Sequence, residues 1–274
     1  MPTKRFKKFL VALCVFCLFI PIVVGGITIH QYSKVKSLCN QIKAGESINT
    51  TISNAMTAPS WFDGIAAVMQ IDGPKIPLVE ACYYRNVQAV EVLLENGANP
   101  NVFFDGRFSP LEAAIVYGPV DESSLAIVKL LLEHGADVNQ FGSEAPLLIK
   151  LTTFLAAGNQ NPIVQEMVLL LVRHNADGHW NGYNRAVFDI VKSGHVNLAS
   201  AYFDINKHDV EELNNEGQSL LIATIINQQQ PNALEMVKLL LECGIDIHTV
   251  DSKGYTAYDY AMQYKLYEIA DIVS

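Results

Sequence analysis

The chain has 274 residues, half of them hydrophobic, with no low-complexity segment and no extreme overall charge. This length and composition can build a substantial core, which excludes a disordered or fibrous protein. The formal net charge is -9, yet the charged side chains of residues 1–36 are all basic and every acid lies beyond them. The acidic remainder repels phosphate backbones, so the charge excludes nucleic-acid binding and favours a basic protein surface as the partner.

The N-terminal segment has the pattern of a membrane-targeting sequence. Four basic residues lie within the first eight, and residues 9–29 follow without a charge and with Thr28 as the single polar side chain. A run of this length can span a bilayer, and the positive-inside rule leaves its basic end in the cytoplasm. The alternative is a cleaved signal peptide, with residues 10–20 as its apolar region and Val24 and Gly26 before the cleavage site. The length of the run favours the anchor, and both interpretations export the rest of the chain.

The sequence divides into three N-terminal segments, up to residue 75, and a repeat domain. Residues 1–8 are a cytoplasmic basic segment, residues 9–29 the anchor or signal segment, and residues 30–75 a linker and N-terminal cap rich in Ser, Thr, Asn, Gly and Pro. Residues 76–274 form the repeat domain. Three cysteines outside the hydrophobic run are far apart and odd in number, which argues against a disulfide framework. They are Cys39, Cys82 and Cys243, and the last two are expected to be buried packing residues.

From residue 76 onward the sequence repeats a unit of two helices. The second helix of each unit carries adjacent apolar pairs one turn apart, which places them on one buried face. Each ends at Gly or Asn, which most readily adopt the left-handed conformation that closes a last turn. About five repeats and a C-terminal capping repeat are predicted. The expected buried sets are Ala89, Val90, Leu93 and Leu94; Ile127, Val128, Leu131 and Leu132; Met167, Val168, Leu171 and Val172; Leu198, Ala199, Tyr202 and Phe203; Met236, Val237, Leu240 and Leu241; the end residues are Gly97, Gly135, Asn175, Asn206 and Gly244.

The first helix of each unit has a recurring start. Proline occurs in several of these starts and fits the first turn of a helix, where its missing N–H would have no partner. The starts are Ile76-Pro77-Leu78, Ser109-Pro110-Leu111, Ala145-Pro146-Leu147, Arg185-Ala186-Val187, Ser219-Leu220-Leu221 and Thr256-Ala257-Tyr258.

These patterns resemble the ankyrin repeat family, whose unit of about 33 residues pairs a Thr-Pro-Leu-His-x-Ala start with a second helix ending in Leu-Leu-x-x-Gly-Ala-Asp-Val-Asn. Residues 135–139 match that ending fully, and residues 97–101, 175–177 and 244–247 match it closely. The resemblance covers residues 70–274 and implies an all-α ankyrin-repeat solenoid, with helix-turn-helix repeats and hairpin loops, preceded by one transmembrane helix or signal sequence. The family's histidine is replaced at every start, by Val79, Glu112, Leu148, Phe188, Ile222 and Asp259, so the hydrogen bonds between neighbouring repeats are expected to differ.

Three units are longer than the family's repeat. The extra residues lie near 119–123, 158–162 and 228–232, each time between a first and a second helix. Equivalent positions of a solenoid line up in space, so these turns are expected to cluster along one edge, where insertions often mark a binding face.

The concave side of the stack is a second candidate surface, which the resemblance implies for partner binding. Aromatic residues and Arg are enriched at interface hot spots, and several fall on first helices or hairpin tips. The alternative is that each aromatic packs only on its neighbour. The candidate partner-binding residues are Tyr83, Tyr84, Phe103, Phe104, Arg107, Tyr117, Trp180, Tyr183 and Gln229.

The sequence contains no nucleophile elbow, phosphate-binding glycine loop or His-Glu-x-x-His helix, so we expect no enzyme, no cofactor and no metal site. A metal-like group, His174, Asp177 and His179, lacks a Cys or Glu partner. His174 shares its repeat position with His134, where a histidine can bind terminal helix carbonyls. Ser193-Gly194-His195 is interpreted as structural.

The sequence therefore predicts a non-enzymatic protein-binding module exposed outside the cytoplasm, in a bacterial envelope-anchored ankyrin repeat protein. Export of a binding fold favours an immunity-type inhibitor that neutralises a secreted toxin or effector, for which a lipase is one candidate. The alternative is a scaffold or assembly factor for envelope proteins. The expected location is the bacterial inner membrane, single-pass, with the C-terminal domain in the periplasm, or the soluble periplasm after cleavage. The expected partner is a protein, with membrane contact through the N-terminal anchor, no nucleic acid and no small-molecule substrate.

Overall fold

The computed structural model describes residues 36–46, 48, 76–102, 109–140, 145–180, 182–227 and 232–274, except for the side chains of Trp180, Tyr183 and Asn184. The predicted basic segment and anchor lie outside these residues, as does most of the predicted linker. Among the residues that are described, no helix combines the length and the apolar character needed to cross a membrane.

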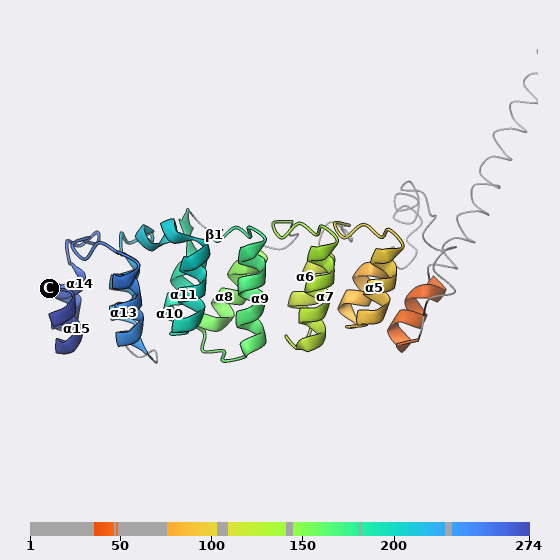
Figure 1. The fold of residues 1–274 in the computed structure, drawn as a ribbon, viewed down its shortest axis with the longest axis horizontal. Coiled ribbons are helices and arrows are strands. Elements are labelled where there is room, and N and C mark those ends of the chain that lie inside the picture. Colours follow the sequence, from red (N-terminus) through yellow and green to blue (C-terminus); the bar gives the residue numbers. More distant parts are fainter. Residues whose placement is uncertain are drawn as a thin grey trace, which may run out of the picture.

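Six helix pairs follow one another along the described chain and stack side by side in two layers (Figure 1). The first helices pack on first helices, as α4 does on α6 and α12 on α14, and the second helices pack on second helices. The pairs are α4 (Pro77–Tyr83) and α5 (Val87–Glu95); α6 (Pro110–Val116) and α7 (Glu122–Glu133); α8 (Leu147–Ala156) and α9 (Pro162–Arg173); α10 (Arg185–Lys192) and α11 (Val196–Ile205); α12 (Leu220–Ile226) and α13 (Ala233–Glu242); α14 (Ala257–Gln263) and α15 (Tyr267–Ile272).

Two short elements interrupt the helical pattern. β1 (His179–Trp180) pairs antiparallel with β2 (Tyr183–Asn184), with Trp180 opposite Tyr183. β2 leads directly into α10. A 3-10 helix, η1 (Lys207–Glu211), follows α11. The expected all-α solenoid is therefore present in the described residues, with one two-stranded hairpin added.

Residues 36–44 form a helix that extends the stack ahead of α4. Leu38, Ile42 and Ile48 are buried in the common core. The amide of Asn86, in the turn after α4, donates to the Ile42 carbonyl at 3.2 Å. The backbone N–H of Gly45 donates to the same Ile42 carbonyl and closes the end of this helix. The backbone N–H of Arg85 donates to the Cys82 carbonyl in the same way at the end of α4. Part of the segment predicted as linker and cap thus acts as a further first helix.

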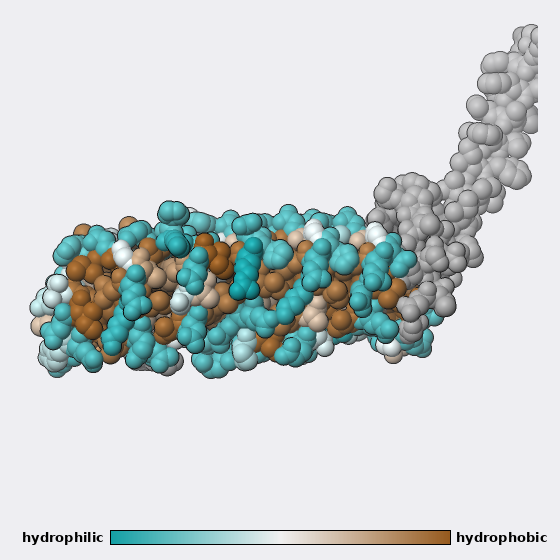
Figure 2. All heavy atoms as spheres, viewed as in Figure 1, coloured by the Kyte–Doolittle hydropathy of each residue, from teal (hydrophilic) through white to brown (hydrophobic). Residues whose placement is uncertain are grey.

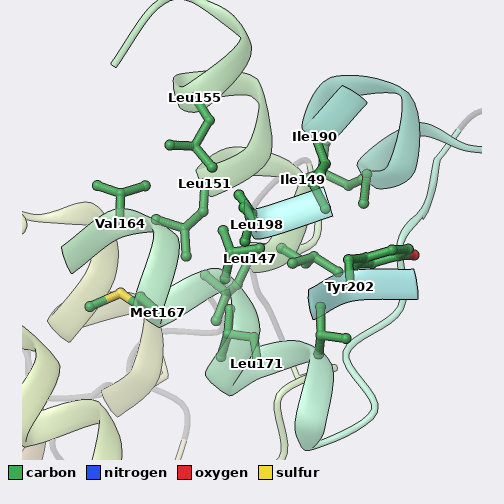
Figure 3. Close-up of a cluster of buried hydrophobic side chains, with 14 of the residues drawn as sticks. Leu147, Ile149, Leu151, Leu155, Val164, Met167, Leu171, Ile190, Leu198 and Tyr202 are labelled. Atoms are coloured by element: carbon green, nitrogen blue, oxygen red, sulfur yellow. The ribbon is translucent and has the colours of Figure 1, made fainter. Parts of the chain in front are cut away.

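The core consists of the residues predicted from helical spacing. Of the apolar sets expected on the second helices, every member is buried except Leu241, which is half-buried. Figure 3 shows this packing in the middle of the stack, where Leu147 and Leu151 of α8 lie among Met167 and Leu171 of α9 and Leu198 of α11. Burying each such side chain stabilises the fold by about 1.5 to 3 kcal/mol.

The helix ends follow the prediction with two exceptions. Gly97, Gly135, Gly244 and Asn175 have positive φ angles, because the left-handed residue lets the following amides reach the last carbonyls. The prediction for Asn206 is wrong, since its φ is -115° and its carbonyl begins η1 by accepting from Asp209. Pro146 is likewise the residue before α8 and not within its first turn, unlike Pro77 and Pro110, which open their helices as predicted.

Polar side chains tie neighbouring first helices where the family's histidine is missing. Glu112 of α6 is almost fully buried, completes a capping box with Ser109, and lies 3.4 Å from the Lys150 ammonium of α8. The Thr153 hydroxyl of α8 donates to the buried Asp189 carboxylate of α10 at 2.8 Å. Buried carboxylates are tolerated only when they are paired and hydrogen-bonded, so these contacts fix how α6, α8 and α10 stack.

Asparagine side chains link successive hairpin loops in the same way. The Asn139 amide donates to the Asn175 carbonyl at 3.0 Å, and its oxygen accepts from the Asp177 N–H at 2.8 Å. One repeat earlier, Asn101 makes the matching pair of bonds to Gly135 and Asp137. Each asparagine therefore satisfies one donor and one acceptor of the next loop.

We expect Asn139→Ala to lower the free energy of unfolding by about 1 to 2 kcal/mol, because two inter-repeat hydrogen bonds are lost. Urea unfolding followed by circular dichroism measures this change. Asn197→Ala is the matched control, since Asn197 is an exposed asparagine on α11, and it should change the midpoint little. Equal effects of the two substitutions would contradict a linking role for Asn139.

Candidate functional site

Three of the predicted partner-binding residues come together on the first-helix layer. Tyr83 and Tyr84 end α4, and Tyr117 ends α6. The rings of Tyr83 and Tyr84 meet edge to face with centroids 5.0 Å apart, and the rings of Tyr83 and Tyr117 lie 5.8 Å apart. Tyr83 is 49% exposed and Tyr84 36%, whereas Tyr117 is half-buried. We call these three residues the tyrosine cluster.

Arg85 holds the cluster in place. Its guanidinium donates to the carbonyl oxygens of Cys82 at 2.9 Å and Ala113 at 3.0 Å, and also to that of Tyr117. The last two bonds cross from α4 to the end of α6. Arg85 also has a φ of 59°, which is strained for a residue with a side chain. The bonds to three carbonyls offset that strain, so the two tyrosine-bearing helix ends keep a fixed spacing.

A lysine from the preceding helix borders the cluster. The Lys43 ammonium lies 5.5 Å from the centroid of the Tyr84 ring, within the range of a cation–π interaction. Partial burial raises the pKa of the Tyr117 hydroxyl, with smaller contributions from Glu112 and Tyr83. Tyr117 is therefore neutral at physiological pH, and Arg85 and Lys43 are basic residues beside the cluster.

Two further exposed apolar side chains lie on α6 and α8 and were not among the predicted site residues. Val116 on α6 is 40% exposed and Phe154 on α8 is 48% exposed. The exposure of Phe154 could have been predicted from helical spacing. The buried stripe of α8 includes Leu147, Leu151 and Leu155, and Phe154 lies beside that stripe. Phe154 therefore belongs to the exposed side of α8 and not to its buried stripe.

The other predicted site residues cannot be placed in this cluster. Phe103, Phe104, Arg107 and Gln229 lie outside the described residues. Trp180 and Tyr183 are described in their backbone only, as the opposed pair of the β1–β2 hairpin. Their partner-binding role stays a prediction.

The two helix layers carry different charge. The six second helices hold ten acidic side chains but three basic ones, Lys129, Arg173 and Lys238. The first helices, counted with residues 36–44, hold four acids and five bases, and two of the acids, Glu112 and Asp189, are buried. Of the two helix layers, the second-helix layer is therefore the acidic one, and the first-helix layer that carries the tyrosine cluster is close to neutral.

Two of the inserted turns, at residues 119–123 and 158–162, lie side by side as predicted, and of the third only residue 232 is among the described residues. The Asn161 amide donates to the Val120 carbonyl at 2.8 Å, joining the turns of two neighbouring pairs. Beyond the short turn of the next pair, the Asn232 amide reaches the Gly194 carbonyl at 3.4 Å. Between these turns a groove of about 460 Å³ opens beside Gln160 and Glu235. Figure 2 shows that this edge and the opposite loop edge are mostly hydrophilic, with hydrophobic residues visible between the helices.

The histidines singled out in the sequence serve helix ends and loops. His134 ends α7 with its ring 2.9 Å from the Leu130 carbonyl, and His174 ends α9. The exposed His179 ring contacts the Asp177 carboxylate at 2.9 Å. Across the described ranges, no cluster of three or more His, Cys, Asp or Glu residues has the arrangement of a metal site. The turn histidine His195 contacts the Ser193 hydroxyl at 2.9 Å.

The cysteines are free thiols in the described residues. Cys82 is fully buried, as expected, and burial raises the pKa of its thiol far above the usual range. Cys39 is also buried, whereas Cys243 is only half-buried, so the expectation of burial holds for Cys82 but not fully for Cys243. Partial burial, together with Glu242 and Asp204 nearby, raises the pKa of the Cys243 thiol.

Two substitutions of Arg85 separate its bonds from its backbone strain. Arg85→Ala loses the bonds to three carbonyls and keeps the strained φ, so it should lower the free energy of unfolding by about 2 to 4 kcal/mol. Arg85→Gly loses the same bonds but relieves the strain, so it should cost about 1 kcal/mol less. Denaturant unfolding compares the two variants.

Lys265 provides the control, because it occupies the equivalent turn position after α14 with a φ of 60°. Lys265→Gly relieves strain without removing a bond that crosses between helices, and it should raise the free energy of unfolding by about 1 kcal/mol. An Arg85→Gly variant that gains as much stability as Lys265→Gly would show that the guanidinium bonds contribute nothing.

The chain is similar to known repeat proteins along most of its length. The family described as ankyrin repeats (3 copies) matches residues 33–141 and 154–274. An ankyrin repeat protein of Fowlpox virus (strain NVSL) is 34% identical over 142 residues, which cover 51% of this chain and 23% of that protein. Zygote-specific protein 3 of Chlamydomonas reinhardtii is 46% identical over 65 residues, or 24% of this chain and 16% of that protein. The match thus spans less than a quarter of either relative.

Solved structures show the same architecture. The crystal structure of EF0377, an ankyrin repeat protein, matches with a TM-score of 0.56 and 26% identity, covering 72% of this chain and 95% of that one. The human ASB11 ankyrin repeat domain matches with a TM-score of 0.53 over 86% of this chain and 97% of that one, and at 19% identity it shows the fold alone. The family match begins at residue 33, so it includes the helix at residues 36–44 that the repeat pattern from residue 70 onward did not. On the family match and the stacked helix pairs together, this chain belongs to the ankyrin repeat family.

Proposed function

We propose that this ankyrin repeat protein binds a protein partner on its first-helix layer, with the tyrosine cluster as the centre of the contact. The observation that carries the proposal is that two exposed tyrosines and one half-buried tyrosine meet across α4 and α6 while Arg85 fixes both helix ends. Tyrosine has few rotatable bonds and combines apolar area with a polar tip, so a fixed group of tyrosines loses little entropy on binding.

The contact surface extends beyond the cluster in both directions along the stack. Lys43 borders it on the N-terminal side, and the exposed Val116 of α6 and Phe154 of α8 belong to the same helix layer. Because this layer is nearly neutral, its affinity comes from burying aromatic area more than from charge. A strongly basic partner would meet the acidic second-helix layer instead.

In the finer form of the proposal, the partner is a secreted toxin or effector, and the chain is an immunity-type inhibitor held outside the cytoplasm by residues 9–29. The basic residues followed by a long uncharged apolar run support export and anchoring in the bacterial inner membrane. The repeat domain supports inhibition by occlusion, in which a rigid surface covers the partner's active site. The inhibitor requires one tight partner, whereas a scaffold for envelope proteins would bind several clients weakly.

Affinity purification of the full chain from a detergent extract of its native membranes, followed by mass spectrometry, tests this role. One stoichiometric partner whose activity the chain suppresses is the expected result. Many weakly retained envelope proteins would contradict the inhibitor role and support a scaffold. Retention of no protein at all would contradict both.

For the partner so identified, we expect Tyr84→Ala to raise Kd by about 30-fold or more, since truncating a hot-spot aromatic costs about 2 kcal/mol. Isothermal titration calorimetry on the full chain gives the Kd. Glu95→Gln and Glu133→Gln, on the second-helix layer, are the control substitutions and should leave Kd within about threefold. The reverse pattern would place the contact on the acidic layer.

A further inference from the structure

A groove of about 360 Å³ lies between α11 and α13, two neighbouring helices of the second-helix layer. Its volume falls within the range of small-ligand pockets, roughly 300 to 1,000 Å³. We call it the acidic groove, and it belongs to the opposite helix layer from the tyrosine cluster. The side chains that line it from α11 and the following η1, and then from the end of α13, are Phe203, Asp204 and Lys207, and Leu239, Glu242 and Cys243.

Two carboxylates converge on this groove. Asp204 and Glu242 occupy the same position in their repeats, two residues before Asn206 and Gly244 respectively. The pKa of the Cys243 thiol is raised first by partial burial and then by the charges of Glu242 and Asp204, so both carboxylates lie close to one sulfur atom. None of the ion pairs between described residues includes either carboxylate. The groove therefore contains two negative charges that the described chain leaves without a counter-charge.

Both carboxylates also lie where a negative charge is unfavourable. Each is in the last turn of its helix, where the free carbonyl oxygens carry a partial negative charge that repels an acid and attracts a cation. Neither α11 nor α13 has a basic residue in its last turn. The equivalent residue of α9 is Arg173, which supplies such a charge to its own helix end. A cation between α11 and α13 would therefore stabilise two carboxylates and two helix ends at once.

The bases near the groove do not neutralise it. Lys207 lines the groove and Lys238 lies one turn before Glu242, but neither forms an ion pair with Asp204 or Glu242. The surface formed by α11, η1, α13 and α15 is strongly acidic and attracts a cation. Its acids are Asp204, Asp209, Glu211, Glu235, Glu242, Glu268 and Asp271, and its bases are Lys207 and Lys238.

We propose that the acidic groove binds an arginine side chain of a protein partner, with the guanidinium group between Asp204 and Glu242. A guanidinium is planar and has several donors, so it can bridge two carboxylates, whereas an ammonium acts as a point charge. Phe203 and Leu239 provide apolar surface for the aliphatic part of the arginine. A bare metal ion fits less well, because no three His, Cys, Asp or Glu side chains among the described residues are arranged to hold one.

Fluorescence anisotropy with a peptide probe tests this site. The peptide Gly-Gly-Arg-Gly-Gly, blocked at both ends and carrying an uncharged dye, is titrated with the full chain in an uncharged detergent. The salt concentration is about 150 mM, at which exposed charges more than about 8 Å apart are screened. The arginine peptide should bind about tenfold or more tightly than the same peptide with uncharged citrulline, because citrulline loses the charge-assisted hydrogen bonds. Equal binding of the two peptides, or no binding of either, would overturn the proposal.

Substitutions within the groove locate the binding. Asp204→Asn and Glu242→Gln should each weaken binding of the arginine peptide by about tenfold. Neither should lower the midpoint of thermal unfolding, because each removes a negative charge from a helix C-terminus, so a weaker affinity would not come from a loss of fold.

Two further substitutions are the controls. Glu133→Gln, at the equivalent position of α7, and Tyr84→Ala, in the tyrosine cluster, should each leave the Kd of the arginine peptide within about twofold. If Glu133→Gln weakens binding as much as Glu242→Gln does, the whole acidic layer attracts the peptide and the groove is not its site. Because the probe does not contact the first-helix layer, the result is independent of the partner proposed for the tyrosine cluster.

Discussion

The structure depends on one constraint: a helix pair of this chain cannot bury its apolar residues alone. Leu131, Leu171 and Leu240 are fully buried because each second helix packs on the second helices beside it as well as on its own first helix. Stability therefore accumulates along the stack, from pair to pair, and the geometry of any surface patch is set by how neighbouring pairs register. Side chains that reach from one pair to the next consequently have more influence on function than their number suggests.

The side chains that connect neighbouring helix pairs differ along the stack. Between α4 and α6 the link is Arg85, which donates to main-chain carbonyls of the neighbour. Between α6 and α8, and between α8 and α10, it is a buried carboxylate with its donor, Glu112 with Lys150 and Asp189 with Thr153. Both solutions replace the histidine bonds of the family, and both place charged groups where their desolvation is offset by several bonds. The first-helix layer is thereby held in register without adding net charge to its surface.

The sequence predicts the regular part of this architecture well because that part depends on local chemistry. Apolar spacing identifies the second helices and their buried residues, and Gly97 or Asn175 marks a helix end through backbone preference. Where tertiary context decides, the prediction fails: Asn206 continues into η1, although its residue type suits a left-handed end. The helix at residues 36–44 also goes unrecognised. It is followed by Gly45, like other helices of the stack, but it lacks both the Pro-Leu start and the loop ending of the repeat pattern.

The candidate site likewise combines features that local sequence predicts with features that tertiary packing decides. Tyr83, Tyr84 and Tyr117 are foreseeable as aromatics on first helices, but their meeting depends on Arg85, whose role arises only when α6 lies beside α4. The exposure of Phe154 and Tyr258 has a different origin, although both are aromatics on first helices. Phe154 lies off the buried stripe of its helix, so no neighbour in the stack could cover it. Tyr258 occupies a position that is buried in every earlier pair, so residue type and helix spacing alone do not predict whether a first-helix aromatic is exposed.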